Sequence, residues 1–321
     1  MTGYEVVRFP SGFSHAVGTL LAMGRNGDSL LFSSLPDGSE IGCWDARTGG
    51  RIWYDDEGMS GCNDKAPVRL LDGEVLLAVA TEDGVEWWDA SSGRRRQDMT
   101  WDGWTIWALA DGILPDGRPI LVGAGQDGAV YRWDATDGDL IGSSQGFDSM
   151  TAVTFVPSPD GFGVIVSGDE SGRIWRWSAA DGQPLGAPFP AHGSRLRVIQ
   201  RLPVDGGRLF VSCGQDGVMK RWDVTTGAQV GSDIVAGTDV FSVASVDVGG
   251  KGVLLAAGAD DIVRAWDAGT GETITLSLDG TVVSALTQRN GESLLATSTA
   301  RGVVTVHTCS FQADWQPVTD E

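Results

Sequence analysis

The strongest constraint on this chain is a ten-residue pattern that recurs at an almost constant interval. The stretch 214–223 reads Gly-Gln-Asp-Gly-Val-Met-Lys-Arg-Trp-Asp, and 125–134 is a close copy of it. Together with four weaker copies, these carry a tryptophan at one shared place: Trp44, Trp88, Trp133, Trp177, Trp222 and Trp266. Consecutive tryptophans are 44 or 45 residues apart. The chain is therefore an array of similar units, which bury one continuous core when they pack side by side.

Two sets of glycines divide each unit into four short strands, named a to d in chain order. The first set marks the turn between strands a and b: Gly27, Gly73, Gly117, Gly161, Gly206, Gly250 and Gly291. The second set lies five residues after each tryptophan and marks the turn between strands c and d: Gly49, Gly93, Gly138, Gly182, Gly227 and Gly271. Asp-Gly and Asn-Gly, which occur in the first set, supply the positive φ angles of two-residue hairpins, so each marks a strand reversal.

The apolar pattern agrees with this division. Strand b is almost continuously apolar, as at 75–80 and 253–257, which is typical of a strand buried on both faces. Strand c alternates between apolar and polar residues, as at 174–177. A seventh unit, 292–309, has His307 where the others have tryptophan. We predict an all-β fold of seven four-stranded antiparallel units.

These units resemble the WD40-repeat β-propeller family over almost the whole sequence. Five of them place Trp-Asp at the end of strand c, and the family repeats at ~40–45 residues per blade. The resemblance implies a single seven-bladed β-propeller domain over residues 1–321. It also implies that a strand from the opposite terminus closes the ring, so residues 4–9 are expected as the outer strand of blade seven. The tail, 310–321, either packs over this joint or competes for the outer position.

Composition limits the kinds of partner. The net charge of −20, from 43 acidic and 23 basic residues, disfavours nucleic acid and anionic membranes. The arginine run 94–96 is expected to be a solvated face. Four cysteines without CxxC spacing predict neither a zinc site nor a disulfide framework. No signal peptide and no membrane-spanning apolar segment are recognisable, so we predict a cytoplasmic monomer.

Motifs for catalysis, cofactor binding or metal binding are also lacking. No serine has a Gly-x-Ser-x-Gly setting, and no phosphate-binding loop of the P-loop type occurs. His15, His192 and His307 are too far apart in the sequence to show metal-ligand spacing. We expect no catalytic residue, no cofactor and no metal, and His307 is expected to fill a core position.

The WD40 resemblance implies a structural hydrogen-bonded set in each blade, made of a histidine before strand a, a serine or threonine on strand b, an aspartate in the b–c turn and the tryptophan of strand c. Blade five alone supplies all four, as His192, Ser212, Asp216 and Trp222. Such a set pairs a buried indole N–H and a carboxylate that would be costly unpaired. Asp127 and Asp260 occupy the turn position in other blades without a matching histidine.

The resemblance further implies that the b–c and d–a loops open on one face and contact partners there. The predicted partner-binding residues are His15, Glu82, Trp101, Trp104, Gln126, Met150, Glu170, Arg195, Gln215 and Phe241. They predict a non-catalytic scaffold that binds a protein or peptide around the central channel. The alternative is a propeller that binds or converts a small molecule at the channel mouth, where the acidic and amide members of this set would converge.

The segment 101–107 contains three tryptophans at a spacing of three. Trp107 is expected to face the core. Trp101 and Trp104 are either exposed as a binding hot spot or fill the gap between blades two and three, where Trp87 also lies. Both alternatives are compatible with the sequence.

Overall fold

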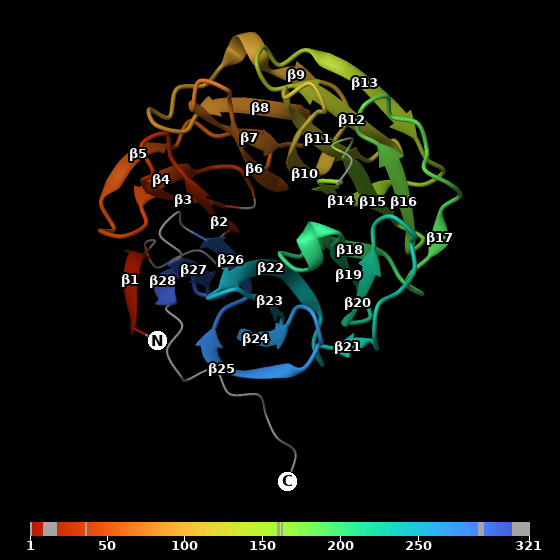
Figure 1. Ribbon diagram of the computed structural model, residues 1–321. Coiled ribbons are helices and arrows are strands. Elements are labelled where there is room, and N and C mark those ends of the chain that lie inside the picture. The colour runs from red at the N-terminus through yellow and green to blue at the C-terminus, as the bar shows by residue number, and fades with distance from the viewer. Residues whose placement is uncertain are drawn as a thin grey trace.

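The chain forms a ring of seven four-stranded antiparallel sheets around a central channel (Figure 1). This computed structural model describes residues 2–8, 18–35, 37–158, 161, 163–287 and 292–309. The predicted seven-bladed β-propeller is confirmed. Strand a of each blade lies at the channel and strand d at the rim, because each sheet is ordered a-b-c-d from the centre outward.

The first three blades follow the predicted units. Blade one contains β2 (Gly18–Met23), β3 (Ser29–Ser34), β4 (Ile41–Asp45) and β5 (Arg51–Asp55). Blade two contains β6 (Asp64–Arg69), β7 (Val75–Ala80), β8 (Gly84–Asp89) and β9 (Trp101–Asp102), with the 3-10 helix η1 (Gln97–Met99) before β9. Blade three contains β10 (Ile106–Ile113), β11 (Pro119–Gly125), β12 (Ala129–Asp134) and β13 (Leu140–Gln145).

The remaining blades repeat this order. Blade four contains β14 (Met150–Val156), β15 (Val164–Asp169), β16 (Arg173–Ser178) and β17 (Phe189–Pro190). Blade five contains β18 (Leu196–Arg201), η2 (Asp205–Gly207), β19 (Leu209–Gly214), β20 (Val218–Asp223) and β21 (Ile234–Val235). Blade six contains β22 (Val240–Val248), β23 (Lys251–Gly258), β24 (Ile262–Asp267) and β25 (Thr273–Asp279). Blade seven contains β26 (Val282–Thr287), β27 (Ser293–Ser298) and β28 (Val303–Cys309).

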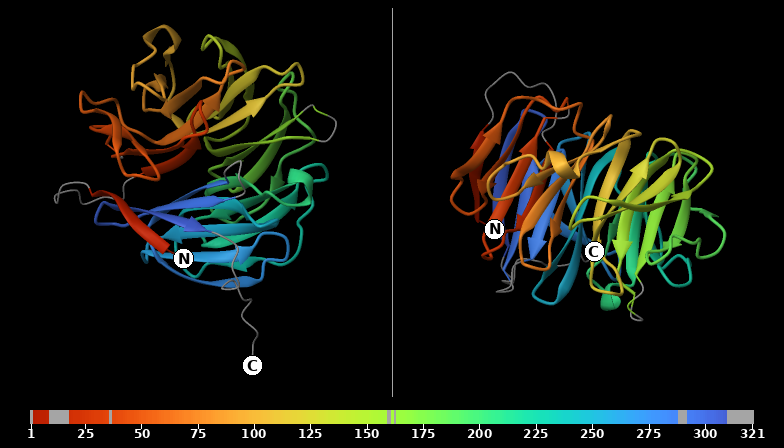
Figure 2. Two further views of the ribbon diagram at one scale, coloured as in Figure 1. Left: turned by 60° about the vertical axis from the view of Figure 1, so that its left-hand side comes forward. Right: turned by 90° about the horizontal axis from the view of Figure 1, so that it is seen from above.

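The N-terminal strand completes blade seven. β1 (Thr2–Arg8) pairs antiparallel with β28, with Tyr4 opposite Val306 and Arg8 opposite Val303. Figure 2 shows this red strand beside the blue strands of the last blade. The predicted closure is therefore confirmed, and the strand begins two residues earlier than expected. Phe9 and the tail 310–321 lie outside the described residues.

Apolar clusters fill the gaps between neighbouring blades. Every residue of β7, β11 and β19 is buried, as predicted for strand b. Leu76 and Trp87 of blade two pack with Trp133 of blade three, and all three side chains are fully buried. No helix in the described parts of the chain is long and apolar enough to cross a membrane.

Arginines of strand c tie blades three to six together, a feature that the repeat pattern did not reveal. Arg132 donates to the carbonyl of Ala179 at 3.0 Å, and Arg176 donates to the carbonyls of Val224 at 3.0 Å and Thr225 at 2.6 Å. Arg221 donates to the carbonyl of Thr270 at 2.9 Å. In each case the acceptors belong to the c–d turn of the following blade, so the bonds cross the gap between two sheets.

Candidate functional site

The b–c and d–a loops open on the same face of the ring, which we call the loop face. A repeated backbone hydrogen bond joins the two loops of a blade: Glu82 N to Ser60 O, Gln126 N to Thr105 O, Glu170 N to Ser149 O, Gln215 N to Arg195 O and Ala259 N to Asp239 O, all at 2.9–3.0 Å. In these five blades, one residue near the start of the b–c loop is thus held in a common place. The four predicted residues at that place, Glu82, Gln126, Glu170 and Gln215, are all exposed.

A pocket of about 450 Å³ opens on the loop face between blades three and four. Three predicted residues line it together, namely Gln126, Glu170 and Arg195. Five further residues complete its wall: Trp107, Asp127, Phe147, Asp148 and Ser149. We call this the blade 3–4 pocket. Sequence reasoning missed Phe147 and Asp148, although they directly precede strand a in a d–a loop, the place from which other candidates were chosen.

Aromatic rings form two sides of the pocket. Phe147 is 76% exposed and meets the ring of Trp175 edge-on, with 5.0 Å between ring centroids. The Arg173 guanidinium lies over the Phe147 ring at 5.6 Å. On the other side, Arg195 lies over the ring of Trp107, also at 5.6 Å. Arginine at such distances is held to an aromatic face by cation–π attraction.

The pocket's carboxylates differ in how far they are already engaged. Asp127 accepts hydrogen bonds from the Tyr131 hydroxyl at 2.6 Å and from the backbone N–H of Ala129 at 3.1 Å. Asp148 accepts from Arg173 and from the Ser171 hydroxyl, both at 2.5 Å. Neither Glu170 nor Arg195 forms an ion pair within the described part of the chain.

A β-bulge at the start of strand a corrects two predictions. The register shifts between Ile106 and Ala108, and likewise between Met150 and Ala152, so one extra residue enters strand a in each blade. Trp107, expected in the core, is the extra residue and is turned toward the pocket and the channel, where it is half-buried. Met150, expected to contact a partner, is fully buried in the cluster between blades three and four. It therefore offers no surface for binding.

Of the two alternatives for the tryptophan segment, filling a gap between blades applies to Trp101, and exposure at the surface applies to Trp104. Trp101 is half-buried and packs on Tyr131 and Trp133, with ring centroids at 4.9 and 5.3 Å, so it fills the gap between blades two and three. Trp104 is 60% exposed. Phe241 is 43% exposed, and Arg197 lies over its ring at 5.6 Å. His15 lies outside the described residues.

The blade-five set lies under the loop face. Ser212 Oγ is 2.8 Å from Nε2 of His192 and accepts a hydrogen bond from Trp222 Nε1, also at 2.8 Å. Nδ1 of His192 is 3.4 Å from a carboxylate oxygen of Asp216. Burial lowers the pKa of His192, against the opposing attraction of Asp216. The ring is thus favoured in its neutral form, which suits one donor and one acceptor nitrogen.

In blade four, the buried tryptophan N–H groups are also hydrogen-bonded, although this blade has no histidine in the set. Trp177 Nε1 donates to Ser167 Oγ at 2.9 Å, and Trp175 Nε1 donates to Asp169 at 2.9 Å. Asp169 is fully buried and also accepts from Arg173 Nε at 2.8 Å. Because Arg173 also binds Asp148, it connects this buried carboxylate to the blade 3–4 pocket. In the sequence, this pair is visible only as an aspartate four residues before an arginine, a spacing that matches no recognised motif.

The central channel is a separate cavity of about 770 Å³ between the seven inner strands. The pKa values of two carboxyl groups in the channel are raised. Desolvation raises the pKa of Asp64, although hydrogen bonds from the backbone N–H groups of Leu109 and Lys65 act against this rise. Desolvation also raises the pKa of Asp111, against the attraction of Arg201. Of the four residues expected at the channel mouth, Gln126 and Glu170 line the blade 3–4 pocket instead, and Glu82 and Gln215 line neither cavity. Within the described ranges, no group of three or more potential metal ligands occurs.

Comparison with known proteins supports the propeller. Residues 37–274, about three quarters of the chain, match a protein family described as outer membrane protein assembly factor BamB. No curated protein matches the chain significantly. The matched range runs from the b–c loop of blade one to the outer strand of blade six, so the similarity extends around most of the ring. The chain therefore belongs to the BamB family of β-propellers.

Proposed function

We propose that this propeller is a non-catalytic scaffold of the WD40 type that binds a protein or peptide partner on its loop face, around the mouth of the channel. The observation that carries the proposal is the exposure of three aromatic side chains on that face, Trp104, Phe147 and Phe241, of which Phe147 lines the blade 3–4 pocket and Phe241 lines the channel. Large aromatic side chains are enriched in protein interfaces, where they anchor binding hot spots. The description of the family as an assembly factor is consistent with a protein partner.

The chemistry of the pocket supports binding more than catalysis. Its lining contains one hydroxyl side chain, Ser149, and no histidine, cysteine or lysine that would activate it. Asp127 and Asp148 are engaged in hydrogen bonds within the fold. We also propose that the protein acts as a cytoplasmic monomer and contacts neither nucleic acid nor a membrane, in keeping with its net charge of −20.

The proposal predicts that partner capture depends on the exposed aromatic residues of the loop face. A triple Trp104→Ala, Phe147→Ala and Phe241→Ala variant is expected to lose the proteins that the wild type captures from native lysate. The reason is that truncating a hot-spot side chain costs roughly 2 kcal/mol or more of binding free energy. Quantitative mass spectrometry of the captured proteins measures the loss, and the melting temperature checks folding.

A matched control lies on the opposite face, where Leu71 is 80% and Ile113 is 62% exposed. The Leu71→Ala, Ile113→Ala variant removes a similar type of surface and is expected to capture the same proteins as the wild type. Retention of every partner by the triple variant, or the same losses in both variants, would show that the loop face is not the binding surface.

A further inference from the structure

Charge is unevenly divided between the two faces of the ring. The described b–c and d–a loops of the loop face contain only two basic residues, Arg195 and Arg301. Their acidic residues are far more numerous: Asp37, Glu40, Asp56, Glu57, Glu82, Asp83, Asp127, Asp148, Glu170, Asp216, Asp239, Asp260 and Asp261. A surface of this kind attracts positively charged segments and repels negatively charged ones over about a Debye length.

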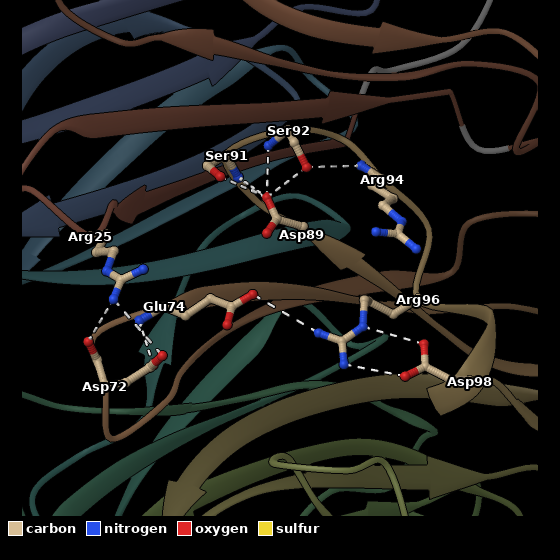
Figure 3. A network of polar contacts seen from close by, with 9 residues as sticks. All are labelled: Arg25, Asp72, Glu74, Asp89, Ser91, Ser92, Arg94, Arg96 and Asp98. Atoms are coloured by element: carbon tan, nitrogen blue, oxygen red, sulfur yellow. Dashed lines mark hydrogen bonds and ion pairs between the residues drawn. The ribbon is translucent and has the colours of Figure 1, made fainter.

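The arginines of the loops gather on the opposite face instead. The a–b and c–d loops contain Arg25, Arg47, Arg94, Arg96, Arg118 and Arg208, and also Arg95, whose guanidinium reaches across to the carbonyl of Gly58 in a d–a loop at 2.7 Å. Figure 3 shows part of this region, where Arg25 pairs with Asp72 at 3.9 Å and Arg96 pairs with Asp98 at 3.3 Å. The loops of the opposite face thus contribute more arginines than those of the loop face. On the loop face, Arg173, Arg197 and Arg264 from the strands pair with Asp148, Asp239 and Asp260, and the other acidic residues of its loops outnumber Arg195 and Arg301.

In the blade 3–4 pocket, acidic side chains lie beside an exposed aromatic ring. It is lined by three carboxylates and by one cation, Arg195. Asp127 and Asp148 already accept hydrogen bonds, but Glu170 is exposed and has no ion-pair partner among the described residues. Phe147, at 76% exposure, lies in the same wall. A carboxylate and an aromatic ring together suit the ammonium or guanidinium head of a long side chain and its apolar stem.

We propose that the partner segment is basic, and that one of its lysine or arginine side chains enters the blade 3–4 pocket, pairs with Glu170 and lies against Phe147. This inference rests on the proposed function, since it specifies the chemistry of the same surface. Arg195 lies over Trp107 at the other side of the pocket and opposes an incoming cation. It therefore favours entry on the Glu170 side.

Two synthetic nonapeptides of serine, glycine and leucine test the proposal, one with three lysines and one with three glutamates in the same places. Isothermal titration calorimetry measures their binding to the intact protein. The lysine peptide is expected to bind at least roughly tenfold more tightly than the glutamate peptide at low salt, and to lose affinity as salt rises. We expect Glu170→Gln to weaken lysine-peptide binding roughly three- to tenfold, and Arg195→Gln to strengthen it.

The control is Asp139→Asn, which removes an equal charge from an exposed c–d turn of blade three on the opposite face. It is expected to leave binding almost unchanged, which separates the pocket from net charge. Equal or tighter binding of the glutamate peptide would overturn the basic preference, as would no measurable binding of the lysine peptide. Equal effects of Glu170→Gln and Asp139→Asn would overturn the placement in the pocket. Each result leaves the capture experiment with the aromatic variants as an independent test of the proposed function.

Discussion

Ser212 is the residue that holds the blade-five hydrogen bonds together. Its hydroxyl meets both His192 and Trp222 at 2.8 Å, and all three residues are buried. Removing the hydroxyl would leave two buried polar groups without that partner, and a buried group that loses its hydrogen bond retains its desolvation cost. Asp216 contributes differently, because its side chain is 35% exposed and water is able to replace its partner.

We expect Ser212→Ala to lower the free energy of unfolding by about 1–3 kcal/mol and Asp216→Ala to lower it by less. Urea denaturation followed by tryptophan fluorescence measures both. Ser167→Ala in blade four is the matched control, because Ser167 bonds Trp177 without a histidine and should cost less. Equal denaturation midpoints for the two serine variants would argue against a bridging role for Ser212.

At the scale of single residues, the sequence identified the members of the blade-five set but did not show which way the side chains at the start of strand a point. The four members of the blade-five set could be named from the sequence because their spacing matches a known pattern. The directions of Met150 and Trp107 could not be read, since a bulge of one residue reverses the alternation of a strand. Each blade has its own bulge: Trp107 is the extra residue in blade three, and Met150 directly precedes the extra residue in blade four.

At the scale of elements, the c–d turn is where neighbouring blades are joined. Gly182 has φ of 74°, and a Cβ on it would lie 2.7 Å from the Arg132 guanidinium of the preceding blade. Glycine is therefore required at position 182 for two reasons: the positive φ angle of the turn and the close approach of the arginine. In the equivalent turn of blade five, Asp223 follows the tryptophan and accepts hydrogen bonds from the N–H groups of Thr225 and Thr226 at 2.9 and 2.8 Å.

Arg176→Met tests whether the arginines stabilise this joint. We expect it to lower the free energy of unfolding by about 1–3 kcal/mol, because carbonyls of the next blade lose charge-assisted hydrogen bonds while the apolar stem is kept. Chemical denaturation is again the measurement. Arg118→Met is the control: Arg118 forms exposed ion pairs within its own blade, which contribute ~1 kcal/mol at most. The hypothesis fails if the two variants unfold at the same denaturant concentration.

At the scale of the whole molecule, stability depends on closing the ring. β1 comes from the N-terminus and pairs with β28, so the first and last described strands share one sheet. Without β1, the edge of β28 would present unpaired backbone N–H and C=O groups, and such edges recruit other chains. The joint therefore governs both the cooperativity of unfolding and the tendency to associate.

A variant that lacks residues 1–8 is expected to melt at a lower temperature and to form oligomers that the full chain does not form. Differential scanning calorimetry and light scattering measure the two effects. A synthetic peptide of residues 1–9 should restore part of the melting temperature when added to the truncated protein, since it supplies the missing strand. A truncated protein that stays monomeric with an unchanged melting temperature would show that β1 is dispensable.

The sequence by itself determined the number of blades and the order of their strands, because these follow from short-range signals repeated at a constant interval; the closing strand was expected only from the resemblance to WD40 propellers. Turn glycines and apolar runs act within a few residues, and seven repetitions make the pattern unambiguous. Only the tertiary structure decided that Gln126, Glu170 and Arg195 share a pocket with Phe147, and that Arg176 reaches the next blade. These contacts join residues from different units, so they depend on the bulge in strand a and on the spacing between neighbouring sheets, neither of which has a signal within a single repeat.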